Sequence, residues 1–152
     1  MSAFVFLILA SSVAFAAGAT VDCSGVTPGA FTTITAALAS LPAAGPNSIS
    51  VTGTCHENVV MFGRTDLIIF GNPTATVVPG NANGHLLAIA ASQRVGIQNI
   101  TFDGGRGALV SDNSRVDFTS VTIQNSLGIG LTSIDSLVHI ADSTIKNSTR
   151  SG

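Results

Sequence analysis

The chain has 152 residues, enough for one domain, of which 9% are charged and 45% are hydrophobic. A net charge of −2 with this apolar content argues against disorder and provides no basic field that would attract nucleic acid. Phe is the only type of aromatic residue, and Gly, Ser, Thr, Asn, Val and Ile dominate. This mixture favours short strands joined by tight turns over a helical bundle.

Residues 1–16 are typical of a secretory signal peptide. An apolar run spans residues 4–10, and Ala14-Phe15-Ala16 matches the small-x-small pattern that precedes a cleavage site. No Lys or Arg precedes the run, which leaves an uncleaved membrane anchor as the alternative, although a membrane span needs roughly 20 apolar residues. We expect cleavage after Ala16, no stable membrane span in the mature chain, and a secreted, cell-surface or periplasmic location.

The two cysteines, Cys23 and Cys55, offer one disulfide bond. In an oxidising compartment an even, low cysteine count predicts that they pair. The bond would tie the mature N-terminus to the first strands of the fold. Two unpaired buried thiols are the alternative, and export of the chain favours the disulfide.

Residues 17–48 are predicted to form an N-terminal segment that carries one helix, at about 32–41. Thr32 or Thr33 could cap this helix, and Pro42 would end it. A helix of this length is too short to be stable alone, so it must lay its apolar face on other apolar residues. That face consists of Ile34, Ala37, Leu38 and Leu41.

Residues 49–152 are predicted to form stacked β coils. Short β-like runs, each bounded by Gly, Pro or Asn, occupy residues 49–51, 58–62, 67–70 and 76–78. From residue 87 onward the chain repeats itself at a period of 21 and then 22 residues. The aligned columns are Val95, Val116 and Val138; Ile97, Phe118 and Ile140; Thr101, Thr122 and Thr144; and Phe102, Ile123 and Ile145.

A fixed period near 20 with several short strands in each repeat indicates a β-solenoid, in which each coil adds one strand to each of several parallel sheets. A leucine-rich repeat is excluded because its Leu-rich consensus is absent. Apolar columns would point inward, and Asn125 and Asn147 would stack in a turn and tolerate left-handed backbone angles. The sequence therefore predicts an all-β fold, a parallel β-helix with one short N-terminal α-helix.

The end of the repeat also leads to an expectation. An offset of 22 makes Gly152 equivalent to Gly130, just before the strand around Leu131. We therefore expect a C-terminally truncated solenoid whose last coil is incomplete and exposes strand edges and apolar core. Residues 17–152 expressed alone should then be prone to aggregation.

The opening of the chain carries a longer pattern. Phe31-Thr-Thr-Ile-Thr-Ala-Ala-Leu is followed by Ile49-Ser-Val-Thr-Gly-Thr-Cys-His-Glu-Asn-Val and by a hydrophobic strand that ends at Gly71. This arrangement resembles the opening of right-handed, pectin-lyase-like parallel β-helix proteins, which include pectinesterases and pectate lyases. The resemblance implies right-handed coils, a helix that caps the N-terminal end, and a structural turn at Glu57. It implies no single activity, because this fold hosts enzymes and non-enzymatic surface proteins alike.

Enzymes of this fold that act on acidic polysaccharides need clustered acidic groups, either to bind Ca²⁺ or to act as acid, base and nucleophile. The repeat alignment places Asp103 beside Gln124 and Lys146, and Asp117 beside His139. No two acids are neighbours in the three aligned coils. We therefore expect no complete catalytic site in this chain and no evident cofactor, with Ca²⁺ implied only by the family resemblance.

Two pairs are candidate functional residues. The Val-Asp-Phe sequence around Asp117 is similar to a fragment of the pectinesterase motif in which the Asp is the nucleophile, and Asp117 with His139 could form an acid–base pair. A solvated pair between adjacent coils is the alternative. Arg94 and Arg115, aligned on adjacent coils, could hold a uronate carboxylate in their forked donors. Two splayed surface arginines are the alternative there.

These observations predict a secreted or extracellular β-helix repeat protein that interacts with or acts on extracellular polysaccharide. One alternative is a pectinesterase- or pectate-lyase-like enzyme whose catalytic coils lie beyond residue 152. The other is a non-enzymatic surface solenoid of the adhesin type.

Overall fold

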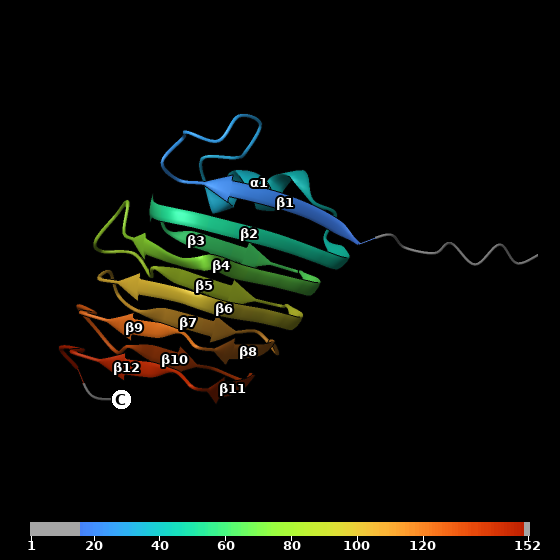
Figure 1. Cartoon of the computed structure of the whole chain (residues 1–152). Coiled ribbons are helices and arrows are strands. Elements are labelled where there is room, and N and C mark those ends of the chain that lie inside the picture. The colour runs from blue at the N-terminus through green and yellow to red at the C-terminus, as the bar shows by residue number, and fades with distance from the viewer. Residues whose placement is uncertain (1–15, 151–152) are drawn as a thin grey trace, which may run out of the picture.

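Inward and outward side chains alternate along each strand, and this alternation builds the fold. In β5 (Leu87–Ala90), Leu87 and Ile89 are buried while the two alanines are partly exposed. Equivalent strands of successive coils pair in parallel, so the buried residues stack into one continuous core. The computed structural model describes residues 16–150 and shows a parallel β-solenoid of about five turns (Figure 1). The predicted parallel β-helix is confirmed, whereas its right-handed coiling stays a prediction.

The described chain forms strands of two sheets and one short helix, α1 (Ile34–Ser40). The strands of the larger sheet are β1 (Ala17–Asp22), β2 (Ala44–His56), β4 (Thr65–Val78), β6 (Gln93–Asp103), β8 (Arg115–Thr119), β9 (Thr122–Gln124), β11 (Leu137–Ala141) and β12 (Thr144–Lys146). Besides β5, the strands of the smaller sheet are β3 (Val59–Phe62), β7 (Ala108–Ser111) and β10 (Leu131–Ser133).

The larger sheet has the order β1-β2-β4-β6-β8-β11, and β9 pairs with β6 and β12 with β9. The smaller sheet has the order β10-β7-β5-β3. In two coils a single long strand, β4 or β6, runs along the larger sheet. In the last two coils two shorter strands take the place of the long one: β8 and β9, and then β11 and β12. Each coil therefore contributes to both sheets, and the core lies between them.

The strand register confirms the sequence repeat. Val95 pairs with Val116, and Val116 pairs with Val138. Asn125 and Asn147 both have a φ of 55°, and Asn147 Nδ2 donates a hydrogen bond to Asn125 Oδ1 at 3.3 Å, as expected for a stacked turn. The other predicted columns are also in register: Ile97, Phe118 and Ile140; Thr101, Thr122 and Thr144; and Phe102, Ile123 and Ile145.

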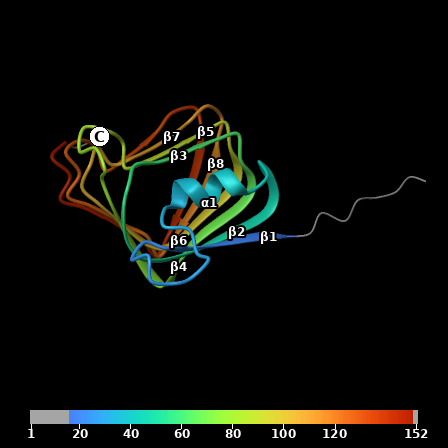
Figure 2. The same ribbon diagram turned by 90° about the horizontal axis from the view of Figure 1, so that it is seen from above.

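Helix α1 covers the N-terminal end of the solenoid (Figure 2). Thr33 is its N-cap, with a side chain that accepts a hydrogen bond from Ala36 N at 3.1 Å. At seven residues the helix is shorter than the predicted 32–41. The described part of the chain contains no helix that is long and apolar enough to cross a membrane. Its predicted apolar face is buried against the first coils and consists of Ile34, Ala37, Leu38 and Leu41.

The predicted N-terminal segment, residues 17–48, already contains strand structure. β1 pairs with β2 from Ala17 and Asn47 to Asp22 and Thr52, and β2 begins at Ala44 rather than near residue 49. Most of β1 is Ala, Gly and Thr, so its own pattern is weak, and the strand depends on the neighbouring edge of β2. The predicted signal peptide, residues 1–16, lies outside the described residues except for its last one.

Candidate functional site

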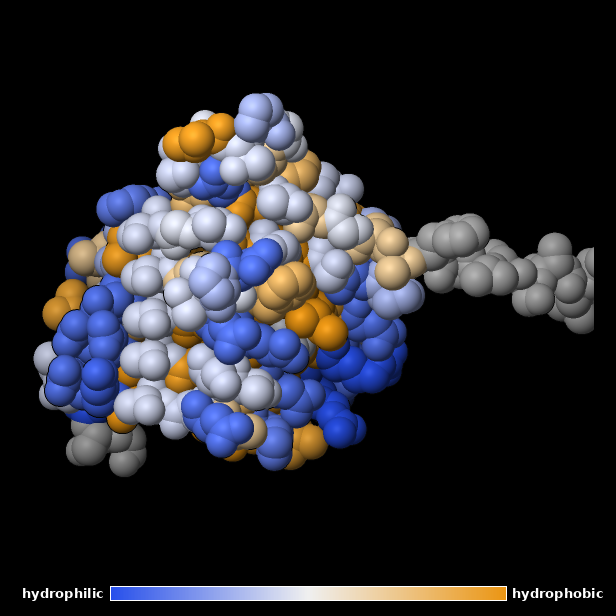
Figure 3. All heavy atoms as spheres, viewed as in Figure 1, coloured by the Kyte–Doolittle hydropathy of each residue, from blue (hydrophilic) through white to orange (hydrophobic). Residues whose placement is uncertain are grey.

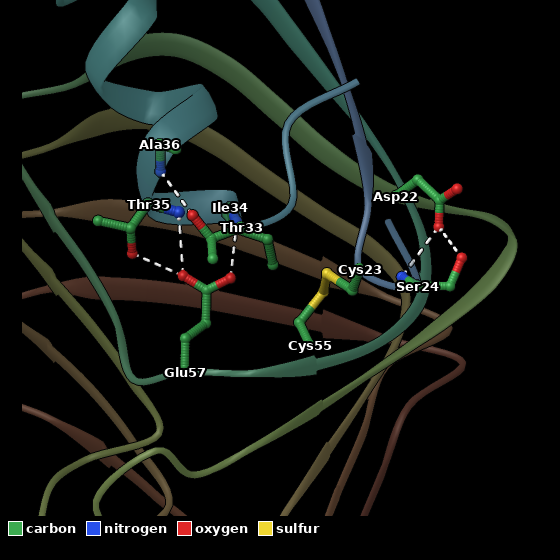
Figure 4. The surroundings of a disulfide bond; sticks show 9 residues. All are labelled: Asp22, Cys23, Ser24, Thr33, Ile34, Thr35, Ala36, Cys55 and Glu57. Atoms are coloured by element: carbon green, nitrogen blue, oxygen red, sulfur yellow. Dashed lines mark hydrogen bonds between the residues drawn. A yellow bond between two sulfur atoms is a disulfide. The ribbon is translucent and has the colours of Figure 1, made fainter. Parts of the chain in front are cut away.

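A disulfide joins Cys23, just after β1, to Cys55 in β2, which confirms the predicted pairing (Figure 4). The two Cα atoms are 5.0 Å apart, and the loop that the bond closes contains α1. A carboxylate oxygen of Glu57 lies within 4.8 Å of the sulfurs. Sulfurs that are bonded to each other are not thiolate ligands, so this cluster is a disulfide cross-link rather than a metal site.

Glu57 holds the first turn of α1 (Figure 4). Its Oε1 accepts a hydrogen bond from Ile34 N at 2.6 Å, and its Oε2 accepts from Thr35 N at 3.0 Å and from Thr35 Oγ1 at 2.6 Å. The first amides of a helix have no partner within the helix, and a carboxylate there also interacts favourably with the helix dipole. Glu57 therefore has a structural role at the capped end of the solenoid.

Asp117 and His139, the candidate acid–base pair, lie side by side on β8 and β11. His139 Nδ1 is 3.7 Å from Asp117 Oδ1, which exceeds the roughly 2.6–3.2 Å over which a proton is transferred directly. The His139 and Asp117 side chains are 69% and 50% exposed, and they line an open groove with Arg115 and Leu137. The geometry is that of a solvated pair, and a catalytic role for it stays a prediction.

Arg94 and Arg115 occupy different settings. The guanidinium of Arg94 forms a forked ion pair with the Asp66 carboxylate of the preceding coil, with Nη2 at 2.6 Å from Oδ2. These hydrogen bonds lower the pKa of the Asp66 carboxyl and raise the pKa of the Arg94 guanidinium. The guanidinium donors of Arg94 are therefore already bound to Asp66. Of the two arginines, only Arg115 lines the open groove. Ligand binding at Arg115 stays a prediction.

A column of threonines runs along the outer surface of the larger sheet. Thr54 pairs with Thr76, Thr76 with Thr101, Thr101 with Thr122, and Thr122 with Thr144. All five are partly or fully exposed, and equivalent side chains on parallel strands lie about 4.8 Å apart. The sequence repeat shows only the last three, because the spacing between coils is irregular before residue 87. We call these five residues the threonine column.

Amide side chains form an ordered polar surface next to the threonine column. Gln124 Nε2 and Asn125 Nδ2 donate hydrogen bonds to the two oxygens of Asp103, at 2.9 and 2.7 Å. Figure 3 shows hydrophilic residues gathered at the left edge of this face, over β9 and β12. Because the network fixes these side chains, the face presents polar groups in defined positions.

Searches with this chain match no protein-family model, no curated protein and no solved structure. Its function is therefore inferred from the solenoid and from the residues on the faces of the two sheets.

Proposed function

We propose that this protein is a secreted or cell-surface β-helix of the pectin-lyase-like kind, with right-handed coils, that binds extracellular polysaccharide through its threonine column. The disulfide between Cys23 and Cys55 is compatible with an oxidising compartment outside the cell. The parallel solenoid agrees with the resemblance of the chain's opening to that superfamily. Solenoids offer long, regular faces that suit long ligands.

The threonine column is the observation that carries this proposal. Each hydroxyl can donate and accept a hydrogen bond, as the hydroxyls of a sugar do. A polysaccharide repeats the same groups along its length, so a column that repeats with every coil can contact several sugar units of one polymer. Once the first contact has formed, the others form within the same complex, and weak individual contacts then give useful affinity.

The test is a binding isotherm of the chain with polygalacturonate and with neutral dextran, for the wild type and for the triple variant Thr76→Val, Thr101→Val and Thr122→Val. Valine keeps the branched shape and the strand preference of threonine while it removes the hydroxyl. Three lost hydrogen bonds of about 0.5–1.5 kcal/mol each should weaken polysaccharide binding about tenfold or more.

A matched control removes three outward hydroxyls from positions of the larger sheet outside the threonine column, with Thr20→Val, Thr65→Val and Thr119→Val. This variant should bind within about twofold of the wild type, because none of its changes touches the threonine column. Equal affinity losses in both triple variants, or no binding of either polymer by the wild type, would refute the proposal.

Enzymatic action on a polysaccharide, by cleavage of its glycosidic bonds or of its methyl esters, is a second candidate function, and the adjacent positions of Asp117 and His139 support it. Asp117 would act as nucleophile or base and His139 as its partner. Incubation with pectin and polygalacturonate would reveal turnover as new reducing ends or released methanol. Turnover that Asp117→Asn abolishes while binding persists would establish an enzyme, and no turnover by the wild type would remove this candidate.

A further inference from the structure

Two arginines and a histidine meet in a pocket at the corner of the solenoid where the chain crosses from the larger sheet to the smaller one. The pocket has a volume of about 140 Å³. It lies away from the groove of Asp117 and His139 and does not include the threonine column. Its lining residues are His85, Arg106, Gly128, Ile129, Thr132 and Arg150.

Stacking of the coils brings these residues together. Arg106 N donates a hydrogen bond to Gly84 O at 3.0 Å, which sets Arg106 beside His85 on the preceding coil. Arg150 N donates to Gly128 O at 3.3 Å, so Gly128 lies on the coil between the two arginines. A Cβ atom at Gly128 would meet only the backbone oxygen of Arg106, at 3.6 Å. The missing side chain of this glycine therefore leaves an open space flanked by positive charge.

The positive charges of the pocket have no acidic partner within residues 16–150. The ion pairs in that part of the chain involve Asp66 and Asp117, which bind other residues. His85, which lines the pocket, has a buried Nδ1 atom without a hydrogen-bond partner, although buried polar atoms are nearly always paired. Asn58 Nδ2 donates to His85 O at 2.9 Å and fixes the loop that carries the ring. Like charges at one corner repel each other unless an anion lies between them.

We propose that this pocket binds an oxyanion of an acidic polysaccharide, either the carboxylate of a uronic acid or a sulfate ester. The two guanidinium groups offer forked donors that match paired oxygens in both chemistries. The Thr132 hydroxyl and the ring N–H of His85 supply further hydrogen-bond donors beside them. The choice of a polysaccharide rests on the proposed function, whereas the anion site rests on the charges and the shape of the pocket.

Calorimetric titration of the chain with polygalacturonate, dextran sulfate and neutral dextran tests this site. Arg106→Gln and Arg150→Gln should each weaken binding of the acidic polymer about tenfold, the change expected for one lost charge-assisted hydrogen bond. Lys146→Gln, which removes a positive charge from the same coil as Arg150, should change the affinity less than about twofold. The acidic polymer that binds more tightly identifies the group as carboxylate or sulfate. Binding of neutral dextran should be the same in all three variants.

Gly128→Asp provides a second test that keeps every cation. Its carboxylate would lie between Arg106 and Arg150 and compete with the ligand from within the chain. We expect loss of acidic-polymer binding, an unchanged affinity for neutral dextran, and an intact thermal transition. Gly128→Asn, which has the same size without the charge, should retain more of the acidic-polymer affinity than Gly128→Asp.

The outcomes separate this site from the proposed function. If acidic polymers bind the wild type and the arginine variants equally, the anion site is overturned while polysaccharide binding stands. If no polymer binds, the proposed function fails, and titration with sodium sulfate and sodium galacturonate then decides the pocket alone. A saturable response that Arg106→Gln abolishes supports the site, and the same response in both proteins overturns it.

Discussion

The two ends of the described solenoid differ in how their inward-facing residues are covered. At the N-terminal end, α1 lies over the first coil, and Ile34, its first residue, is 1% exposed (Figure 2). At the other end, Ile145 of β12 is 44% exposed, although its register partner Ile123 is only 3% exposed. The same residue type in the same column is therefore buried in one coil and nearly half exposed in the next.

The difference shows where the stability of a solenoid arises. An inward residue is buried only when coils stack on both sides of it, so each coil depends on its neighbours. The N-terminal end replaces the missing neighbour with a helix, and three polar or covalent devices hold that end together: the disulfide, the Glu57 carboxylate and the turn around Asp22. Such devices are concentrated where stacking alone does not cover the core.

The largest expected effect comes from a matched pair of truncations in one column. Ile123→Ala should lower the free energy of unfolding by about 4 kcal/mol, because it opens a cavity between two stacked coils. Ile145→Ala removes the same atoms from a half-exposed site, where neighbours can relax and water can enter, and should cost about 1 kcal/mol. Urea unfolding curves of the two variants measure the difference. Equal losses would show that the last coil is as well covered as the one before it.

Removal of the disulfide between Cys23 and Cys55 should have the next largest effect on the free energy of unfolding. The disulfide spans a sequence separation of 32, and loss of a bond that closes a loop of this size costs about 3.7 kcal/mol in the chain-entropy account. Cys23→Ala with Cys55→Ala should therefore destabilise the chain, and hydrogen exchange should show the loss of protection first in β1 and β2. Protection in β8 and β9 serves as the internal control. A uniform loss along the solenoid would contradict a local role for the bond.

The smallest effect should depend on pH. Asp22 accepts hydrogen bonds from the backbone N–H and hydroxyl groups of Ser24 and Thr27. These bonds hold the pKa of the Asp22 carboxyl far below its ordinary value, and the two hydroxyl bonds contribute most. A depressed pKa stabilises the fold above the unfolded value of about 3.9, and this contribution is lost as the pH falls toward the folded value. Asp22→Asn should therefore be less stable than the wild type at pH 7.

The stability gap between Asp22→Asn and the wild type should narrow steadily below about pH 4. Chemical unfolding at a series of pH values between neutral and strongly acidic measures this gap. Asp142→Asn, a change of an exposed aspartate in the last turn before β12, is the control and should follow the wild type closely. A gap of the same size at acidic and neutral pH would contradict the assignment to the Asp22 carboxylate.

The sequence by itself determined the features that depend on local periodicity. Alternation along short runs predicted strands such as β3, and the repeat from residue 87 placed Phe118 on Ile97 and Ile140 on Phe118. The spacing of four apolar residues and a cap at Thr32 or Thr33 predicted α1, and the structure selects Thr33. The two cysteines predicted the disulfide. Each of these follows from side-chain direction and chain chemistry within a few residues or within one constant period.

Only the tertiary structure decided which groups meet where the period is not constant. Asn47 pairs with Leu67, but Leu67 pairs with Val95, across a longer stretch that includes the turn before β5. That change of spacing hid the Asp66 partner of Arg94, and it hid the first two members of the threonine column. The pocket of two arginines and a histidine likewise exists because turns of unequal length end at the same corner of the coil. The lengths of the turns decide which of these residues stack on one another. The pattern of apolar residues in the strands does not reveal those lengths.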